Sequence, residues 1–380
     1  MTDCATADIG LAAAAAASGS LDYASLLGAA TYLVARADAS ADASWQAQTP
    51  FSLQWQREVA AARDRLAPPS GEVAAVAAYG ERSLKELPGP LQALGSGARA
   101  RALAVAVVAL RAHRAKGIAA ALTAMVVEVC AEPNLTRVLP FLVCLEALRS
   151  IGLAGESGPD APKRRWQLAL AVATRARGPG LVLCCGLSGS GKSFVAGGIA
   201  GDLGATVVAS DRVRKEMAGL RPTERTPEAL RTAVYNNRMT ERVYRALNER
   251  AGVELAAGRP VVLDATFLAS ARRAPALAVA QAQRRPTVVI WCEADGRTAD
   301  RRLQERAARD WTVSDADARI RAFQRRNARP PAATEGAAVI HVDTRGEPAK
   351  LFAELLPRVR RALSPAVGAN AALADHDRPK

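Results

Sequence analysis

The sequence has few aromatic residues, few histidines and no long uninterrupted hydrophobic run. Phe, Tyr and Trp together make up 4% of the 380 residues, and there are three histidines. The six cysteines, at positions 4, 130, 144, 184, 185 and 292, form no Cys-x-x-Cys pair. This spacing excludes the common structural zinc sites, and we interpret the cysteines as reduced, buried side chains.

The sequence shows neither a membrane-spanning run nor a signal-peptide pattern, and both absences bear on where the protein is located in the cell. The most apolar stretches, 102–110 and 117–127, are separated by a basic segment, and neither reaches the ~20 residues that span a bilayer. Near the start of the chain, Asp3 and Asp8 stand where a signal peptide would carry Lys or Arg. We therefore expect a cytoplasmic protein with no membrane partner, in which both apolar stretches are core helices.

Charge is divided unevenly along the chain. Residues 1–162 carry 13 basic and 15 acidic side chains, whereas residues 163–363 carry 36 basic and 20 acidic ones, so the second part accounts for the net charge of +14. A basic domain attracts phosphates, whether on nucleotides or on nucleic acid. A coding bias toward arginine, which would place arginines on solvent-exposed faces of helices, explains the same excess of basic side chains equally well.

Length and pattern predict two domains. Residues 1–150 are Ala-rich with helical periodicity, which predicts an all-α domain of unknown role; residues 151–177 form a linker and a lead-in helix. In residues 178–363, apolar runs at 181–185, 205–209, 260–263, 286–292 and 337–342 alternate with amphipathic segments. This alternation predicts an α/β fold with a five-stranded parallel sheet. We expect residues 364–380 to be a frayed tail.

The motif that carries chemistry is GLSGSGKS, which fits G-x-x-x-x-G-K-[ST] at every position. An apolar strand precedes it and the helix-forming segment 194–203 follows it, so backbone N–H groups and a helix N-terminus converge on one anion. We expect Lys192 to reach the β- and γ-phosphates of ATP, and the Ser193 hydroxyl to ligate Mg²⁺. The expected phosphate-binding residues are Gly186, Leu187, Ser188, Gly189, Ser190, Gly191, Lys192 and Ser193.

A second element follows downstream. The run Val261, Val262, Leu263 and Asp264 is an apolar strand that ends in a carboxylate. A Walker B element needs such a carboxylate to hold the Mg²⁺ shell opposite Ser193. We therefore predict that Asp264 and Ser193 share the metal site.

Asp211 indicates the type of reaction. It stands where the second strand should end, at the edge of the sheet where ligands bind in open α/β folds. A carboxylate there can take a proton from an acceptor hydroxyl, and Arg214, three residues on, could bind an anionic group of the acceptor. The alternative is that Asp211 caps the helix expected at 212–219, and capping and catalysis can coexist.

An arginine-dense helix is expected at 297–309. Arg302 and Arg306 are four residues apart and therefore share one face, which could close over the phosphates as a helical lid. The alternative is a solvated helix whose arginines pair with Glu305 and Asp310.

Four runs within about 178–345 resemble the P-loop kinase domain of bacterial bifunctional aminoglycoside phosphotransferase/ATP-binding proteins. The runs are GLSGSGKS, SDRVRKEMAGL, VYRALNERAGVELAAGRPVVLDATFLASARR and CEADGRTADRRLQER. The layout is also similar to zeta toxins, polynucleotide 5′-hydroxyl kinases and gluconate kinases. The resemblance implies that Asp211 is the acceptor-activating base, Arg214 an acceptor contact, and Arg302 and Arg306 lid arginines. The phosphotransferase domain of those proteins needs a His-x-Asp motif; here Arg114 and Ala115 follow His113.

Two classes of function compete on this evidence. In the first, the chain is an ATP- and Mg²⁺-dependent kinase that acts on a hydroxyl acceptor, either a small molecule or, less favoured, the 5′ end of a nucleic acid. In the second, it is a nucleotide-dependent switch that binds a partner through its helical N-terminal domain. A carboxylate at the position of Asp211 favours the kinase. The tyrosines and tryptophans show no interleaved pattern for stacking single strands, which favours a small acceptor.

Overall fold

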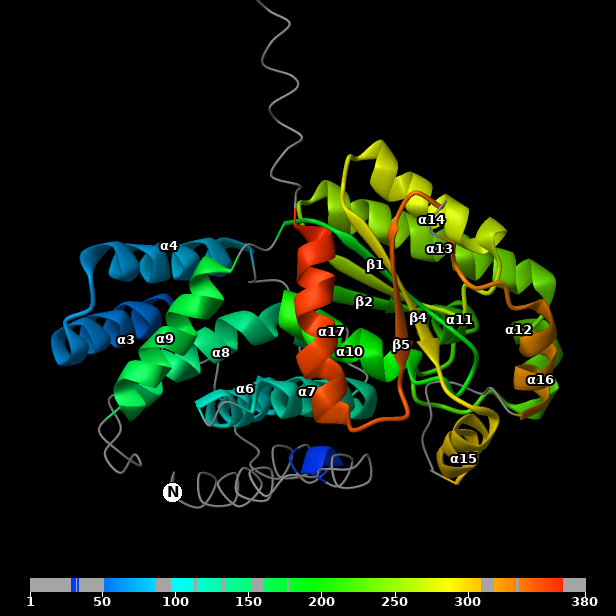
Figure 1. The fold of residues 1–380 in the computed structure, drawn as a ribbon, viewed down its shortest axis with the longest axis horizontal. Helices are drawn as coiled ribbons and strands as arrows, with labels where there is room; N and C mark the ends of the chain where they lie inside the picture. Colours follow the sequence, from blue (N-terminus) through cyan, green and yellow to red (C-terminus); the bar gives the residue numbers. More distant parts are fainter. Residues whose placement is uncertain are drawn as a thin grey trace, which may run out of the picture.

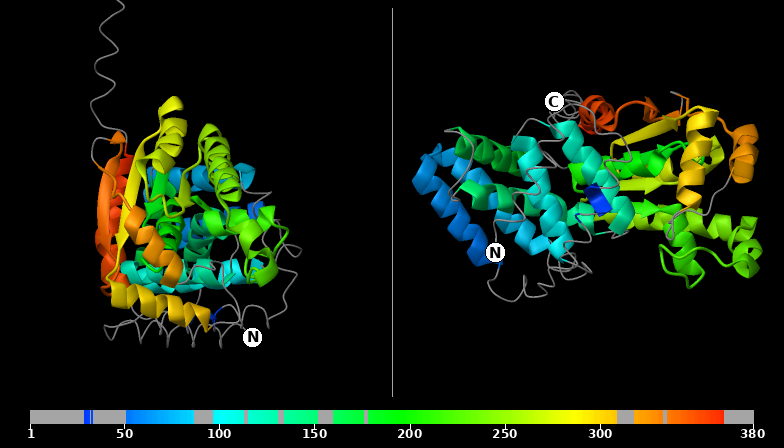
Figure 2. Two further views of the ribbon diagram at one scale, coloured as in Figure 1. Left: turned by 90° about the vertical axis from the view of Figure 1, so that its right-hand side faces the viewer. Right: turned by 90° about the horizontal axis from the view of Figure 1, so that it is seen from below.

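The computed structural model describes residues 29–31, 33, 51–86, 97–112, 115–130, 134–151, 160–175, 178–308, 318–332 and 335–364. A helical part is followed along the chain by an α/β part (Figure 1). Figure 2 shows the helical part at one end of the molecule and the sheet with its outer helices at the other. The predicted fold class, an all-α region ahead of a five-stranded parallel α/β domain, is confirmed.

The helical part is built from Ala-rich, apolar helices. Both apolar stretches of the sequence lie in helices. Pro68 and Pro69 lie between the helices Phe51–Leu66 and Ser70–Glu86, because proline has no N–H group to continue a helix. The turn signals at 88–90 and 95–96, His113, and residues 152–159 of the expected linker lie outside the described residues. The helices are α3 (Phe51–Leu66), α4 (Ser70–Glu86), α6 (Gly97–Ala112), α7 (Lys116–Cys130), α8 (Leu135–Ile151) and α9 (Ala161–Thr174).

The sheet has five parallel strands in the order β2-β3-β1-β4-β5. Each predicted strand is present with ends shifted by at most one residue, because each is a short apolar run bounded by turn residues. All carboxyl ends meet at one edge of the sheet, where ligands bind in open α/β folds. The strands are β1 (Leu181–Cys185), β2 (Thr206–Ala209), β3 (Val261–Asp264), β4 (Thr287–Glu293) and β5 (Ala338–Asp343).

Two layers of helices cover the sheet. Leu181, Leu183 and Cys185 of β1 pack with α13 and α14, whereas Val182 and Cys184 point into a second cluster that contains α10 and α17. Alternation of side chains along a strand produces this division. The helices are α10 (Lys192–Leu203), α11 (Ser210–Met217), α12 (Glu228–Val234), α13 (Asn237–Ala256), α14 (Ser270–Ala282), α15 (Gly296–Ala307), α16 (Ala318–Asn327) and α17 (Pro348–Leu363). Of the expected tail, residues 365–380 lie outside the described residues.

The helical part and α10 share one continuous buried cluster. Glycines allow α7 to approach α10 closely: a Cβ on Gly201 would lie 2.4 Å from Thr123 Cγ2, and one on Gly197 would lie 3.2 Å from Ala124 Cα. No described helix is long and apolar enough to cross a membrane. The described cysteines are free thiols, mostly buried.

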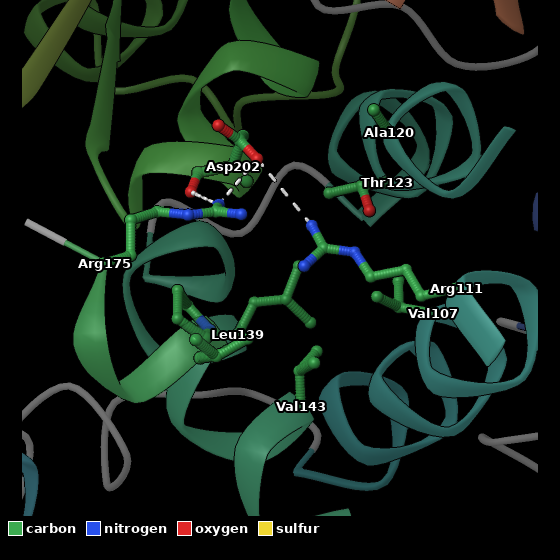
Figure 3. Close-up of a pocket in the computed structure, with 11 residues that line it drawn as sticks. Val107, Arg111, Ala120, Thr123, Leu139, Val143, Arg175 and Asp202 are labelled. Atoms are coloured by element: carbon green, nitrogen blue, oxygen red, sulfur yellow. Dashed lines mark hydrogen bonds and ion pairs between the residues drawn. The ribbon is translucent and has the colours of Figure 1, made fainter. Parts of the chain in front are cut away.

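A charged cluster joins the two parts at the C-terminal end of α10 (Figure 3). The buried carboxylate of Asp202 contacts Arg175 at 2.7 Å, Arg360 at 2.7 and 2.8 Å, and Arg111 at 3.7 Å. Burial raises the pKa of Asp202, but hydrogen bonds and charge from these arginines outweigh it and lower the pKa below its usual value. The adjoining cavity, about 20 Å³, has room for one water and none for a nucleotide.

Candidate active site

The predicted phosphate-binding loop connects β1 to α10. Gly186 and Gly191 have φ values of 143° and 80°, a region that L-residues with side chains rarely adopt. A Cβ on Gly186 would lie 2.5 Å from the carbonyl oxygen of Cys292, so a side chain is also excluded by space. Gly191 is the N-cap of α10, and the first turn of this helix therefore presents its N–H groups to an anion.

Lys192, Ser193 and Asp264 lie together at the start of α10. Lys192 and Asp264 are 8% and 6% exposed, and the Ser193 hydroxyl hydrogen bonds to the Asp264 carboxylate. Burial is the main cause that raises the pKa of Asp264; nearby Asp211 adds to it, while Lys192, Ser193 and Arg306 oppose it. Several groups of the expected site therefore act on this one carboxylate.

These residues fit a magnesium ion. Asp264 Oδ1 is buried and has no hydrogen-bond partner among the described residues, and the Ser193 hydroxyl lies beside it. Mg²⁺ prefers oxygen ligands and is held in such sites by one or two protein oxygens together with phosphate oxygens. When bound, the ion would neutralise phosphate charge that develops in phosphoryl transfer.

Asp211 lies beside Asp264 at the same sheet edge. Ala209, the last residue of β2, pairs with Asp264 of β3, and Asp211 follows in the first turn of α11. The N-cap of α11 is Ala209, so Asp211 does not occupy the capping position of the alternative interpretation. Asp211 is half-buried and acts electrostatically on Asp264. Its role as a base stays a prediction that this placement permits.

Arg214 is buried between α11, α12 and α13. Its Nη1 donates to the Val234 carbonyl at 3.0 Å and to Thr240 Oγ1 at 3.4 Å, and its guanidinium lies 5.1 Å from the centre of the Tyr235 ring. These contacts join α11 to α12 and α13. The predicted contact between Arg214 and an acceptor stays a prediction; the contacts of this side chain hold the surrounding helices together.

The two arginines predicted on the lid helix differ in their surroundings. Arg302 Nη1 donates to Gly189 O at 3.4 Å and to Thr344 Oγ1 at 2.9 Å, against the outer side of the loop. Arg306 acts electrostatically on Asp264 and is half-buried. Glu305, the alternative partner, is paired with Arg301 at 3.7 Å, and Asp310 lies outside the described residues.

Sequence reasoning missed further residues at the loop. The Thr344 hydroxyl donates to the Ser190 carbonyl at 2.8 Å, and the Ser188 N–H donates to Gln324 Oε1 at 2.9 Å. The Gly186 N–H donates to the Thr266 carbonyl at 3.1 Å. Thr344 lies two residues beyond the end of the last predicted strand, 337–342, so its place at the carboxyl edge could have been noticed. Gln324 lies in an ordinary amphipathic helix and gave no signal.

The chain is similar to one family model and to several solved structures. Residues 181–331 match the family model of the AAA domain. Among solved structures, the chain is similar to a gluconokinase from Sinorhizobium meliloti 1021, with 20% identity over 50% of this chain and 95% of that chain and a TM-score of 0.34. It is also similar to a sugar kinase from Janibacter sp. HTCC2649, with 18% identity over 50% of this chain and 97% of that chain and a TM-score of 0.37.

None of the curated proteins matches the chain. The family match begins at β1, contains the phosphate-binding loop, and ends shortly after α16. The match to the AAA domain model and the loop between β1 and α10 therefore fall in the same part of the chain, residues 181–331.

Proposed function

We propose that the chain transfers the γ-phosphoryl group of ATP to a hydroxyl of a small acceptor molecule. The observation that carries the proposal is the convergence of three neighbouring strands. β1 leads into the phosphate-binding loop, β3 ends in Asp264, and β2 leads to Asp211. The residues that we propose to bind phosphate, hold the metal and accept the proton therefore share one edge of the sheet.

Each residue has a defined part in this reaction. The loop N–H groups and Lys192 bind the phosphates, and the oxygens of Ser193 and Asp264 fit Mg²⁺. The Asp211 carboxylate accepts the proton of the acceptor hydroxyl as the new bond from oxygen to γ-phosphorus forms. The bond from γ-phosphorus to the bridging oxygen breaks, ADP leaves, and Arg306 stabilises the charge on the transferring group.

The use of arginine in the α/β part supports a small acceptor over a polynucleotide. Arg273 is 1% exposed and contacts Glu335 and the Phe267 carbonyl, and Arg214 is likewise buried. Arg225 donates to the Ala307 carbonyl at the end of α15 at 2.6 Å. Guanidinium groups that bind other groups of the protein contribute less to a groove that would follow a phosphate backbone.

A transfer screen with γ-labelled ATP tests the proposal. The acceptors are gluconate, aminoglycosides, nucleotide sugars and 5′-hydroxyl oligonucleotides, with Lys192→Ala as the inactive control. Label in a small acceptor supports the proposal. Label in the oligonucleotide, with sub-micromolar affinity at physiological salt, would identify a polynucleotide 5′-hydroxyl kinase instead.

A nucleotide-dependent switch is the second candidate. The observation that favours it is the direct packing of α7 on α10, the helix that begins with Lys192 and Ser193. A change in nucleotide at the N-terminus of α10 would then act on the helical part, which would bind a partner. A chain that binds and hydrolyses ATP, passes label to water alone, and keeps this hydrolysis in Asp211→Asn fits the switch and contradicts the kinase.

A further inference from the structure

Two carbonyl groups of the phosphate-binding loop are held from outside the loop. The Thr344 hydroxyl lies within hydrogen-bond distance of two carbonyl oxygens, and the shorter contact, 2.8 Å, is to Ser190, against 3.1 Å to Glu293. The preceding carbonyl, that of Gly189, accepts from Arg302 Nη1 at 3.4 Å. Thr344 directly follows β5 and Arg302 lies on α15, so both contacts come from elements distant in sequence.

Thr344 is itself fixed in place. Its N–H donates to the Glu293 carbonyl at 3.0 Å, and its side chain is buried, with 4% of the residue exposed. Arg302 donates from Nη1 to the Thr344 hydroxyl at 2.9 Å and from Nη2 to the Thr344 carbonyl at 2.5 Å. A Cβ on Gly191 would lie 3.0 Å from Thr344 Oγ1, so the hydroxyl rests directly against the loop.

The planarity of the peptide unit connects these contacts to phosphate binding. In a trans peptide, the C=O of one residue and the N–H of the next point in opposite directions. Because Thr344 draws the Ser190 carbonyl outward, the Gly191 N–H on the same plane is directed to the inner side of the loop. A donor fixed in this way needs no reorientation when charge arrives, which is the condition for strong electrostatic stabilisation.

We propose that Thr344, supported by Arg302, is a positioning residue that fixes the Ser190–Gly191 peptide plane so that the Gly191 N–H faces the nucleotide phosphates. The inference rests on the proposed function for its nucleotide, but it concerns binding and not the acceptor. It assigns Arg302 a place behind the loop, whereas Arg306 keeps the place beside Asp264.

Nucleotide titrations of the full-length protein test the proposal. Thr344→Val removes the hydroxyl at nearly constant shape, and Thr344→Ser restores it. The measured quantity is the ratio of the affinities for MgATP and AMP, because AMP lacks the β- and γ-phosphates that the loop holds. We expect Thr344→Val to reduce this ratio by about tenfold, as the loss of one hydrogen bond to a charged group implies, and Thr344→Ser to restore it.

A matched control separates positioning from general destabilisation. Thr136 is also a buried threonine whose hydroxyl donates to a backbone carbonyl, that of Ala205, at 2.7 Å. Thr136→Val should lower the melting temperature as Thr344→Val does and leave the affinity ratio unchanged. If Thr344→Val does not fold, Arg302→Lys, which cannot reach all three acceptors, should reduce the ratio by about threefold.

A folded Thr344→Val with the wild-type ratio would overturn the proposal, and so would an equal loss of MgATP and AMP affinity. A wild-type protein that binds MgATP but phosphorylates no acceptor would contradict the proposed kinase alone, and the affinity ratios would still decide the role of Thr344. A wild-type protein that binds no MgATP would contradict both.

Discussion

The helices of the helical part and the phosphate-binding loop of the α/β part are held in place by different kinds of contact. α8 is buried along nearly its whole length among apolar side chains, and α7 approaches α10 at glycines. The phosphate-binding loop is instead fixed by hydrogen bonds from polar groups such as the buried Thr344 and the half-buried Arg302. Apolar packing sets where a helix lies, whereas polar contacts set the direction of single groups. We therefore expect changes in the helical part to alter stability, and changes at the sheet edge to alter binding and turnover.

The largest expected effect is at Lys192. Its ammonium is the lysine charge beside the expected β- and γ-phosphates, so Lys192→Ala should reduce phosphoryl transfer by ~10²-fold or more and weaken ATP binding. Isothermal titration and a transfer assay measure both. Lys350→Ala, an exposed lysine on α17, is the control and should resemble wild type. A folded Lys192→Ala with unchanged ATP affinity and turnover would remove the P-loop interpretation.

The next effect is expected at Asp211, and it tests the proposed chemistry at the edge of the sheet. Asp211→Asn keeps the size of the side chain and removes the proton acceptor, so transfer should fall by ~10²-fold while melting temperature and ATP affinity stay near wild type. Initial rates at saturating ATP, with thermal unfolding in parallel, measure this. Transfer at the wild-type rate would show that Asp211 is not the base.

Asp202 tests the junction between the two parts. Asp202→Asn removes the carboxylate that three arginines contact, and we expect a loss of ~2–4 kcal/mol in the free energy of unfolding. This loss is smaller than for a fully buried cluster, because the Arg360 side chain stays partly exposed to solvent. Glu305→Gln, which breaks the exposed pair with Arg301, should cost less than ~1 kcal/mol. Equal costs in denaturant titrations would contradict the assigned role of Asp202.

The same carboxylate predicts a dependence of stability on pH. The pKa of Asp202 is lowered in the folded protein, so its contribution is fully present above the unfolded pKa of ~4 and is lost as pH falls through the lower folded value. Wild type should therefore lose more stability on acidification below about pH 4 than Asp202→Asn does. Parallel pH profiles for the two proteins would contradict this prediction.

The smallest expected effect concerns the glycine contact between the parts. Gly201→Ala should cost ~1–3 kcal/mol, because the new methyl would overlap Thr123. Gly71→Ala, at an open helical position in α4, should be neutral or stabilising by up to ~1 kcal/mol. If Gly201→Ala also weakens ATP binding in a folded protein, the helical part acts on the nucleotide site. The expectation that changes in the helical part alter stability and not binding would then be wrong.

The sequence predicted local features well. The strands appeared as short apolar runs, and the loop between β1 and α10 and the place of Asp264 at the end of β3 were visible in the sequence, because these features depend on residues close together in the chain. The order β2-β3-β1-β4-β5 and the packing of α7 on α10 depend on which distant surfaces meet, although the glycines of α10 are a visible small-residue face. Arg214 shows the same limit, since an arginine on an amphipathic helix is expected to face solvent and here it is buried.

The most direct test of the central claim is a crystal structure of the protein with Mg²⁺ and a non-hydrolysable ATP analogue. The account predicts a γ-phosphate beside Lys192 and a metal ion on the oxygens of Ser193 and Asp264. The Asp211 carboxylate should then lie within ~2.6–3.2 Å of a water or hydroxyl in line with the γ-phosphorus. An Asp211 side chain directed away from the γ-phosphate, with no space for a hydroxyl between them, would contradict the account.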